Sequence, residues 1–350
     1  MSMPSLKRTL ARYDYRFPPE LIAQRPASPR DAARLLVVDR KAGGLADAFF
    51  RDLPDLLPDG TLLVLNETKV EPARLTLTKE DTGGKVRALI VKREGRRIEC
   101  LVDRPVRPGQ ILRVSAKYRF LAHDLKSGRC VMEALFPAKD FPAAMERFGA
   151  APLPPYIKSH GLTRAEARSR YQSVFARQPG SSAAPTASLH FTDRLLKKLA
   201  ARGIATVKVT LHVSLGTFAP LTEENLREGR LHEEAYEISA AAAKAVNAAK
   251  KAGRPVIPVG TTALRALESA ADEHGRIKAG RSSTRLFIRE GYRFRVADGL
   301  VTNFHVPRSS LMILVAALVG RTRLLAAYRH AVAARYRLFS FGDATLILPK

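Results

Sequence analysis

A change of pattern in the first half of the chain constrains the fold more than any other feature of the sequence. From about residue 75 to residue 135, short runs of alternating apolar and polar residues follow one another, separated by glycine and with no helical pattern between them. Strands at this spacing are typical of an antiparallel barrel or sandwich. The clearest runs are residues 85–91, 98–102, 110–114 and 129–135.

Both flanks of this all-β stretch combine strands with helices. Residues 35–38 and 62–65 are continuous apolar runs, which suit strands of a sheet that is covered on both faces. Strands that alternate with helices indicate an α/β main domain. Further strands are predicted at 207–213, 256–259 and 292–301, and helices at 192–201, 239–251 and 264–271.

The net charge is the most informative bulk property. The 350 residues include 59 Lys and Arg against 33 Asp and Glu, a net charge of +26, which exceeds what solubility requires. Basic residues concentrate at 85–119, 276–295 and 321–337. Such clusters attract phosphate backbones through counterion release. A polyanionic partner is therefore expected, with arginine enrichment across a high-GC genome as the alternative explanation.

No segment of the sequence predicts export or membrane insertion. The longest apolar run, residues 311–319, is half the length that a spanning helix needs, so a buried helix is predicted there. The N-terminal residues lack the apolar core of a signal peptide, and Cys100 and Cys130 are too few for a disulfide framework. These features predict a cytoplasmic protein without a membrane partner. The sequence does not determine the oligomeric state, and a monomer is compatible with it.

The loops that follow the predicted strands indicate one binding site. Ser214, Gly260 and Thr302 each stand directly after a strand, and ligands of α/β sheets bind beyond the carboxyl ends of the strands. The segment 178–192 holds small hydroxyl residues, prolines and His190, which fits a ligand-contacting loop or, alternatively, a surface linker. We expect these four segments to converge on one pocket.

Three common kinds of site do not fit the sequence. No histidine pair in the loops has the spacing of metal ligands, and neither cysteine lies near those histidines, so no metal site is predicted. The residues after the strand at 62–65 lack the glycine-rich turn of a methyltransferase. A Gly-x-Ser-x-Gly nucleophile elbow is also absent.

An ordered series of short motifs runs through nearly the whole chain, from Tyr13 to Ile347. It includes Asn-Glu-Thr-Lys-Val-Glu-Pro-Ala-Arg at 66–74, Leu-Pro-Pro-Tyr-Ile at 153–157, Tyr-Gln-Ser-Val-Phe-Ala at 171–176, the loop 178–192, Leu-His-Val-Ser-Leu-Gly-Thr-Phe at 211–218, Gly-Thr-Thr at 260–262, Thr-Asn-Phe-His at 302–305 and Phe-Gly-Asp at 341–343. In this order the motifs resemble the S-adenosylmethionine:tRNA ribosyltransferase-isomerase family of queuosine biosynthesis. The ordered set is far more specific than any single motif.

The resemblance implies a fold and a reaction. The fold is an α/β main domain with a mixed sheet and helices on both faces, formed by residues 1–66 and 153–350, with a small antiparallel β-barrel domain inserted at residues 67–152. The reaction transfers and isomerises the ribosyl moiety of S-adenosylmethionine onto 7-aminomethyl-7-deazaguanine at the tRNA wobble position, giving epoxyqueuosine and releasing adenine and methionine. S-adenosylmethionine is a substrate in this reaction, and no metal or redox cofactor is implied.

The implied reaction begins with removal of a proton from the ribose 5′-carbon, which the adjacent sulfonium acidifies. This step needs a base poised near neutrality, and His305 or His190 is our hypothesis for it, with a purely structural role as the alternative for each. Thr261 and Thr262, at a predicted helix start, are expected to hold the methionine carboxylate, although Thr262 could instead only cap the helix. Further substrate contacts are expected from Thr186, Gly216, Thr217 and Asn303, and tRNA phosphate contacts from Arg74, Arg281 and Arg285.

Several residues depart from the pattern of the family. Ser188 and Ser214 stand where the family has glycine, and a serine disfavours positive φ. Because the changes fall in the pocket loops, the alternative function is a diverged RNA-binding paralogue with lost or altered catalysis on the same scaffold. The other departures are Ala219 in place of an arginine, and Leu231, Glu233, Ala263 and Ala266 in place of other motif residues.

Overall fold

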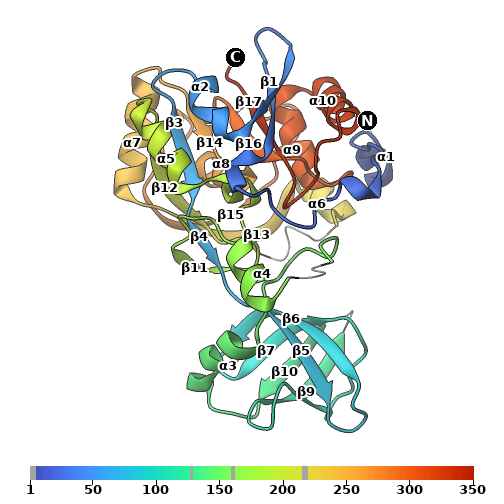
Figure 1. Cartoon of the computed structure of the whole chain (residues 1–350). Coiled ribbons are helices and arrows are strands. Elements are labelled where there is room, and N and C mark those ends of the chain that lie inside the picture. Colours follow the sequence, from blue (N-terminus) through green and yellow to red (C-terminus); the bar gives the residue numbers. More distant parts are fainter. Residues whose placement is uncertain (1–4, 127–128, 159–161, 215–219) are drawn as a thin grey trace. The chain divides into compact units, whose positions relative to one another are not determined.

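Two compact units make up the chain. The computed structural model describes residues 5–126, 129–158, 162–214 and 220–350 (Figure 1). Unit 1 comprises Met1–Lys69, Pro154–Ser159 and Gln172–Lys350, and unit 2 comprises Val70–Leu153 and His160–Tyr171. Unit 2 is thus inserted into the sequence of unit 1. The short elements of the chain are the helices α1 (Leu6–Ala11), α2 (Leu53–Leu56) and α6 (Glu223–Glu228) and the two-stranded sheet of β4 (Thr68–Val70) and β11 (Gln178–Ser181).

The larger sheet of unit 1 has five strands of mixed direction. β14, β3 and β12 are parallel, whereas β13 is antiparallel to both of its neighbours. Every residue of β3 is buried, which explains why its sequence is a continuous apolar run. The strand order is β14 (Val256–Pro258), β3 (Leu62–Asn66), β12 (Ala205–Leu211), β13 (Arg230–Ile238) and β15 (Gly280–Leu286).

Helices cover both faces of this sheet because successive residues of β3 point into different cores. Val64 packs in a cluster with α7 (Ala240–Lys251) and α8 (Thr261–Ala270). Leu63 packs in another cluster with α5 (Asp193–Ala201). The predicted mixed sheet with helices on both faces is confirmed.

A second sheet of four strands completes unit 1. β1 and β17 are parallel, and the other neighbouring strands are antiparallel. An isolated parallel bridge between Val259 and Val301 connects this sheet to the larger one, directly before Gly260. The strand order is β16 (Leu300–Asn303), β17 (Ala344–Ile347), β1 (Arg34–Val38) and β2 (Leu45–Phe49).

The apolar run at 311–319 forms the buried helix that its sequence predicts. This helix, α9 (Ser310–Val319), is capped by Ser309, whose side chain accepts a hydrogen bond from the backbone of Met312. In the described part of the chain, no single helix is long and apolar enough to cross a membrane. α9 and α10 (Arg321–Ala333) reach that length and composition only as a pair, and the pair is bent by 111°.

The strand predicted at residues 292–301 is wrong over most of its length. β16 begins only at Leu300. The backbone N–H groups of Arg295, Val296 and Ala297 donate instead to the buried carboxylate of Glu268, at distances of 2.9 to 3.1 Å. A partner distant in sequence therefore replaces the ladder that the local pattern predicts.

Unit 2 contains a closed six-stranded barrel in which every neighbouring pair is antiparallel. Its interior is filled by alternate residues of the strands, together with residues of α3 (Phe141–Phe148). Of the two predicted alternatives, the barrel is confirmed and the sandwich is wrong. In order around the barrel, the strands are β10 (Arg129–Ala134), β7 (Arg97–Val102), β6 (Lys85–Glu94), β5 (Arg74–Lys79), β8 (Ile111–Arg113) and β9 (Arg119–Lys126).

The limits of the units differ from the expected domain limits at three places. Residues 67–69 belong to unit 1, whereas Leu153 and residues 160–171 belong to unit 2. The last difference arises because α4 (Arg164–Arg170) is tied to α3, where Arg168 donates to the Glu146 carboxylate at 2.9 Å. The local sequence predicts the Thr163 cap of α4, which the structure contains, but not the partner of the helix.

Candidate active site

The carboxyl ends of strands from both sheets of unit 1 open into one cavity of about 380 Å³. The segment after β16, the first turn of α8, Val213 after β12 and the loop around Thr186 all line it. The structure thus brings together five of the predicted site residues, namely Thr186, Thr261, Thr262, Asn303 and His305. Gly216 and Thr217 lie outside the described residues, as does Ala219.

Gly260 fixes the turn from β14 into α8. Its φ of +90° lies in the region that favours glycine, and its N–H donates to the Val301 carbonyl at 2.7 Å. No side chain caps the first turn of α8. The free backbone N–H groups of this turn, which lines the cavity, therefore have no side-chain acceptor. Thr262 thus does not cap the helix, and its hydroxyl accepts a hydrogen bond from the Asn66 amide at 3.1 Å.

Asn303, in the wall of the cavity, has an acceptor without a partner. Its side chain is buried, and its amide nitrogen donates to the Phe339 carbonyl at 3.1 Å. The amide oxygen, Oδ1, has no hydrogen-bond partner among the described residues. A buried acceptor without a partner costs free energy that a bound N–H or O–H group would recover. Phe339 itself has a φ of +71°, a conformation that costs free energy in a bulky residue and is frequent at functional sites.

His305 is held rigidly in the wall of the cavity. Its Nε2 lies 3.0 Å from Thr302 Oγ1, and its backbone N–H donates to the Tyr328 hydroxyl at 2.9 Å. The Tyr15 hydroxyl donates to its carbonyl at 2.8 Å. Burial lowers the pKa of His305 to about 4, so its imidazole is neutral at pH 7.

His190 lies behind Asn303 and does not line the cavity. Its Nε2 is 3.3 Å from the Asn303 amide nitrogen, and its ring lies against Phe50 with 4.8 Å between the centroids. Burial, and then the charges of Arg337 and Arg30, lower the pKa of His190 to about 3. Neither histidine therefore has the pKa near neutrality that was expected of the base, because both imidazoles are removed from water.

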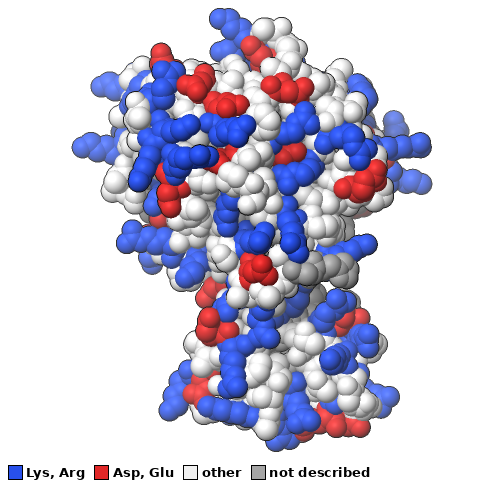
Figure 2. Space-filling view, in the orientation of Figure 1, with Lys and Arg blue, Asp and Glu red and all other residues white. Residues whose placement is uncertain are grey.

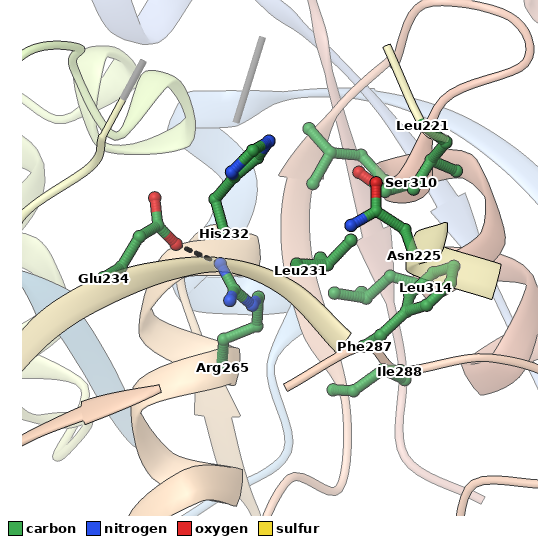
Figure 3. Close-up of a pocket in the computed structure, with 11 residues that line it drawn as sticks. Leu221, Asn225, Leu231, His232, Glu234, Arg265, Phe287, Ile288, Ser310 and Leu314 are labelled. Atoms are coloured by element: carbon green, nitrogen blue, oxygen red, sulfur yellow. Dashed lines mark hydrogen bonds and ion pairs between the residues drawn. The ribbon is translucent and has the colours of Figure 1, made fainter. Parts of the chain in front are cut away.

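A buried ion pair, between Arg265 and Glu234, lies beside the cavity and was not among the predicted site residues. Arg265 comes from α8 and Glu234 from β13, and both side chains are about 95% buried or more. They line a smaller cavity together with His232 (Figure 3). The sequence gives no clear signal for this pair, because Arg265 lies off the apolar stripe of Leu264, Leu267 and Ala271 that the predicted helix presents.

The arginines expected at tRNA phosphates differ in exposure. In unit 2, Arg74 is half-buried, donates to the Leu153 carbonyl at 2.8 Å and has a pKa lowered by burial. In unit 1, Arg281 and Arg285 are exposed on the edge strand β15, where Arg281 pairs with Glu237 at 2.9 Å. Figure 2 shows lysine and arginine side chains spread across the visible face of each unit, with fewer acidic side chains between them.

The departures from the family pattern are accommodated without backbone strain where the structure describes them. Neither Ser188 nor Ser214 is among the described non-glycine residues with positive φ. Ala263 and Ala266 are fully buried on α8, where they fill the core, and Leu231 lines the smaller cavity. Among the residues that the structure describes, no group of three or more His, Cys, Asp or Glu side chains could hold a metal ion.

Comparisons with known proteins connect this geometry to a family. A family model described as queuosine biosynthesis protein matches residues 10–347. The S-adenosylmethionine:tRNA ribosyltransferase-isomerase of Symbiobacterium thermophilum is 47% identical over 348 residues, covering 97% of this chain and 99% of that protein. The protein of the same name from Gloeobacter violaceus is 49% identical over 346 residues, covering 96% of this chain and 95% of that protein.

A solved structure aligns with most of the chain. The crystal structure of S-adenosylmethionine tRNA ribosyltransferase from Thermotoga maritima is 32% identical in sequence. It covers 96% of this chain and 100% of its own, with a TM-score of 0.55. The identity is high enough for this likeness to reflect more than a shared fold.

The buried state of the two histidines predicts an unusual titration. We expect two imidazole signals in NMR spectra that do not shift between pH 5 and pH 8, identified by their loss in His190→Gln and His305→Gln. Both folded-state pKa values lie below the unfolded value of about 6.5. The unfolded chain therefore binds more protons between about pH 4 and pH 6.5, and the stability that is fully present above pH 6.5 falls as the pH falls through this window. Signals that both titrate near pH 6.5 would show that the imidazoles are hydrated.

Proposed function

The chain belongs to the queuosine biosynthesis protein family, and on this basis we propose that it is an S-adenosylmethionine:tRNA ribosyltransferase-isomerase. The enzyme transfers and isomerises the ribosyl moiety of S-adenosylmethionine onto 7-aminomethyl-7-deazaguanine at the tRNA wobble position. The products are epoxyqueuosine in the tRNA, adenine and methionine. The structural observation that carries the proposal is the 380 Å³ cavity at the strand ends, where most of the predicted site residues meet.

The cavity has the size and lining that a nucleoside substrate requires. Its volume lies in the range of about 300–1,000 Å³ that is typical of small-molecule sites. Most of its wall is apolar, which suits an adenine ring, and a few fixed polar groups interrupt it. Among these, the free Oδ1 of Asn303 can accept a hydrogen bond from the adenine amino group or from a ribose hydroxyl.

Of the two histidines, His305 is the one that we assign as the base. It lines the cavity, whereas His190 stands behind Asn303 and positions its amide. The neutral ring of His305 has a lone pair to accept the ribose 5′-proton, and Thr302 holds the ring in orientation. A base of low pKa requires an acidic proton, and the neighbouring sulfonium of S-adenosylmethionine supplies that acidity.

The second substrate is proposed to be a tRNA that carries 7-aminomethyl-7-deazaguanine. The net charge of +26 supports a polyanionic partner. Arg281 and Arg285 are exposed and remain our candidates for phosphate contacts, whereas Arg74 is engaged with the backbone of Leu153. The proposal includes no metal or redox cofactor, because S-adenosylmethionine is itself consumed. A cytoplasmic location stays a prediction.

Adenine release tests the proposed reaction and the role of His305 together. Full-length protein mixed with S-adenosylmethionine and precursor-bearing tRNA is expected to release adenine and to form epoxyqueuosine. His305→Gln should lower kcat by about 10²–10⁴-fold, the usual contribution of a general base, while the Kd for S-adenosylmethionine changes little. His274→Gln, an exposed histidine remote in the fold from the described cavity, serves as the control with unchanged turnover.

The same experiment distinguishes the proposed enzyme from the alternative function. A folded wild-type protein that binds tRNA but releases no adenine would be a diverged RNA-binding paralogue. Wild-type turnover in His305→Gln would remove this histidine from the mechanism without removing the function.

The salt dependence of tRNA binding tests the role of the basic surface. Several phosphate contacts predict a slope of log K against log[salt] with a magnitude above about 2. The double variant Arg281→Gln/Arg285→Gln should reduce that magnitude by about 1 for each arginine that binds a phosphate in the wild type. Arg202→Gln, at the C-terminal end of α5, is the control, because it removes the charge of one exposed arginine that is not expected to bind tRNA. A slope that is unchanged in the double variant would place the tRNA elsewhere on the protein.

A further inference from the structure

A second, smaller cavity of about 20 Å³ adjoins the large one. Three residues line both, namely Leu221, Ser310 and Leu311. In Figure 3 the side chain of Arg265 rises from α8 toward Glu234, and apolar side chains form the opposite wall. Those apolar side chains are Leu221, Leu231, Phe287, Ile288, Leu311 and Leu314.

Arg265 has one donor nitrogen that is unused. Its Nε donates to the Leu286 carbonyl at 3.1 Å, and its Nη1 donates to the Glu234 carboxylate. No acceptor for Nη2 is found among the described residues, although this atom is buried. A charged donor that is removed from water without an acceptor is strongly unfavourable, so the site is built to receive an acceptor.

The ion pair fixes where that acceptor must lie. The Glu234 carboxylate accepts hydrogen bonds from Arg265 and from the backbone N–H of Ser214, at 3.0 Å for the latter. Because the guanidinium is planar and two of its three nitrogens are engaged, the direction of the Nη2 hydrogens is set. Arg265 is therefore preorganised before any ligand arrives.

α8 connects this nitrogen to the large cavity. Thr261 and Thr262, in the first turn of the helix, line the large cavity, and Arg265 stands four and three residues later. Residues at this spacing lie on the same face of a helix, about 5–6 Å apart. One ligand of modest length can therefore contact both turns of α8.

We propose that the small cavity receives the α-carboxylate of the methionyl end of S-adenosylmethionine, with Arg265 Nη2 as its donor. This inference rests on the proposed function. A carboxylate is the acceptor that best matches a buried guanidinium, because hydrogen bonds between two charged groups are the strong ones. The volume fits one small polar group, and the apolar wall suits the methylene groups that lead from the carboxylate to the sulfonium.

This assignment differs from the expected one. The sequence predicts that Thr261 and Thr262 hold the carboxylate at the start of α8. The helix start offers partial charge only, whereas Arg265 offers a full charge in a buried setting. The first turn of α8 then faces the part of the ligand closer to the sulfonium.

Decarboxylated S-adenosylmethionine, which lacks only the carboxylate, isolates this contact. Isothermal titration calorimetry of the full-length protein, without tRNA, measures the Kd of each compound. The wild type is expected to bind S-adenosylmethionine at least tenfold more tightly than the decarboxylated compound. In Arg265→Lys, which keeps a cation opposite Glu234 but lacks the second guanidinium nitrogen, that ratio should fall to below about threefold, through loss of affinity for S-adenosylmethionine alone.

Matched variants keep the result interpretable. Arg202→Lys, on the exposed end of α5, should retain the wild-type ratio. If Arg265→Lys does not fold, the double variant Glu234→Gln/Arg265→Gln, which removes both buried charges together, replaces it and should also lose the preference. A purely structural Arg265 would weaken both compounds equally.

Failure of the inference differs from failure of the proposed function. A wild type that binds both compounds with equal affinity, or a folded Arg265→Lys that keeps the full preference, overturns the inference. The latter result would return the carboxylate to the start of α8, with only water at Nη2. A wild type that binds neither compound would instead contradict the proposed function.

Discussion

The parallel bridge between Val259 and Val301 is the contact on which the candidate site depends. It joins the five-stranded sheet to the four-stranded sheet, and the Gly260 N–H extends it with a hydrogen bond of 2.7 Å to the Val301 carbonyl. Because β14 and β16 are aligned there, α8 and the segment after β16 start side by side. Strand ends of two separate sheets thereby share one cavity, which is the general location of ligands in α/β folds.

Buried charges hold the irregular segments around this cavity. Glu268 accepts three backbone N–H groups of the segment before β16, and Asp343 accepts from the backbone N–H groups of Arg34 and Arg337. Each carboxylate replaces hydrogen bonds that a strand or helix would otherwise provide, which satisfies buried backbone groups outside regular structure. In the pair of Glu234 and Arg265, Nη2 of Arg265 is left without an acceptor, and the carboxylate proposed for the small cavity would supply one.

Burial also shapes the chemistry that the site can perform. The imidazoles of His190 and His305 are both neutral at pH 7, but they stand in different layers, one behind Asn303 and one in the cavity wall. A neutral histidine in the cavity wall can accept a proton from a bound substrate. This arrangement fits a substrate whose own sulfonium charge acidifies the proton to be removed, since a cationic imidazole would repel it.

The sequence by itself determined the fold class and most of the pocket, because these depend on local patterns. The apolar runs of β3 and of residues 311–319, the cap at Thr163 and the motif order predicted the sheet, several helices and the meeting of Thr261, Asn303 and His305. It did not predict the strands β13 and β15, in which charged and other polar residues outnumber the apolar ones and hide the alternation. Only the tertiary structure decided that α4 joins unit 2, that the segment before β16 is held by Glu268, and that Arg265 is buried with one nitrogen free. The reason is that each of these depends on a partner tens of residues away, and a charged residue in a sequence carries no mark of whether such a partner will remove it from water.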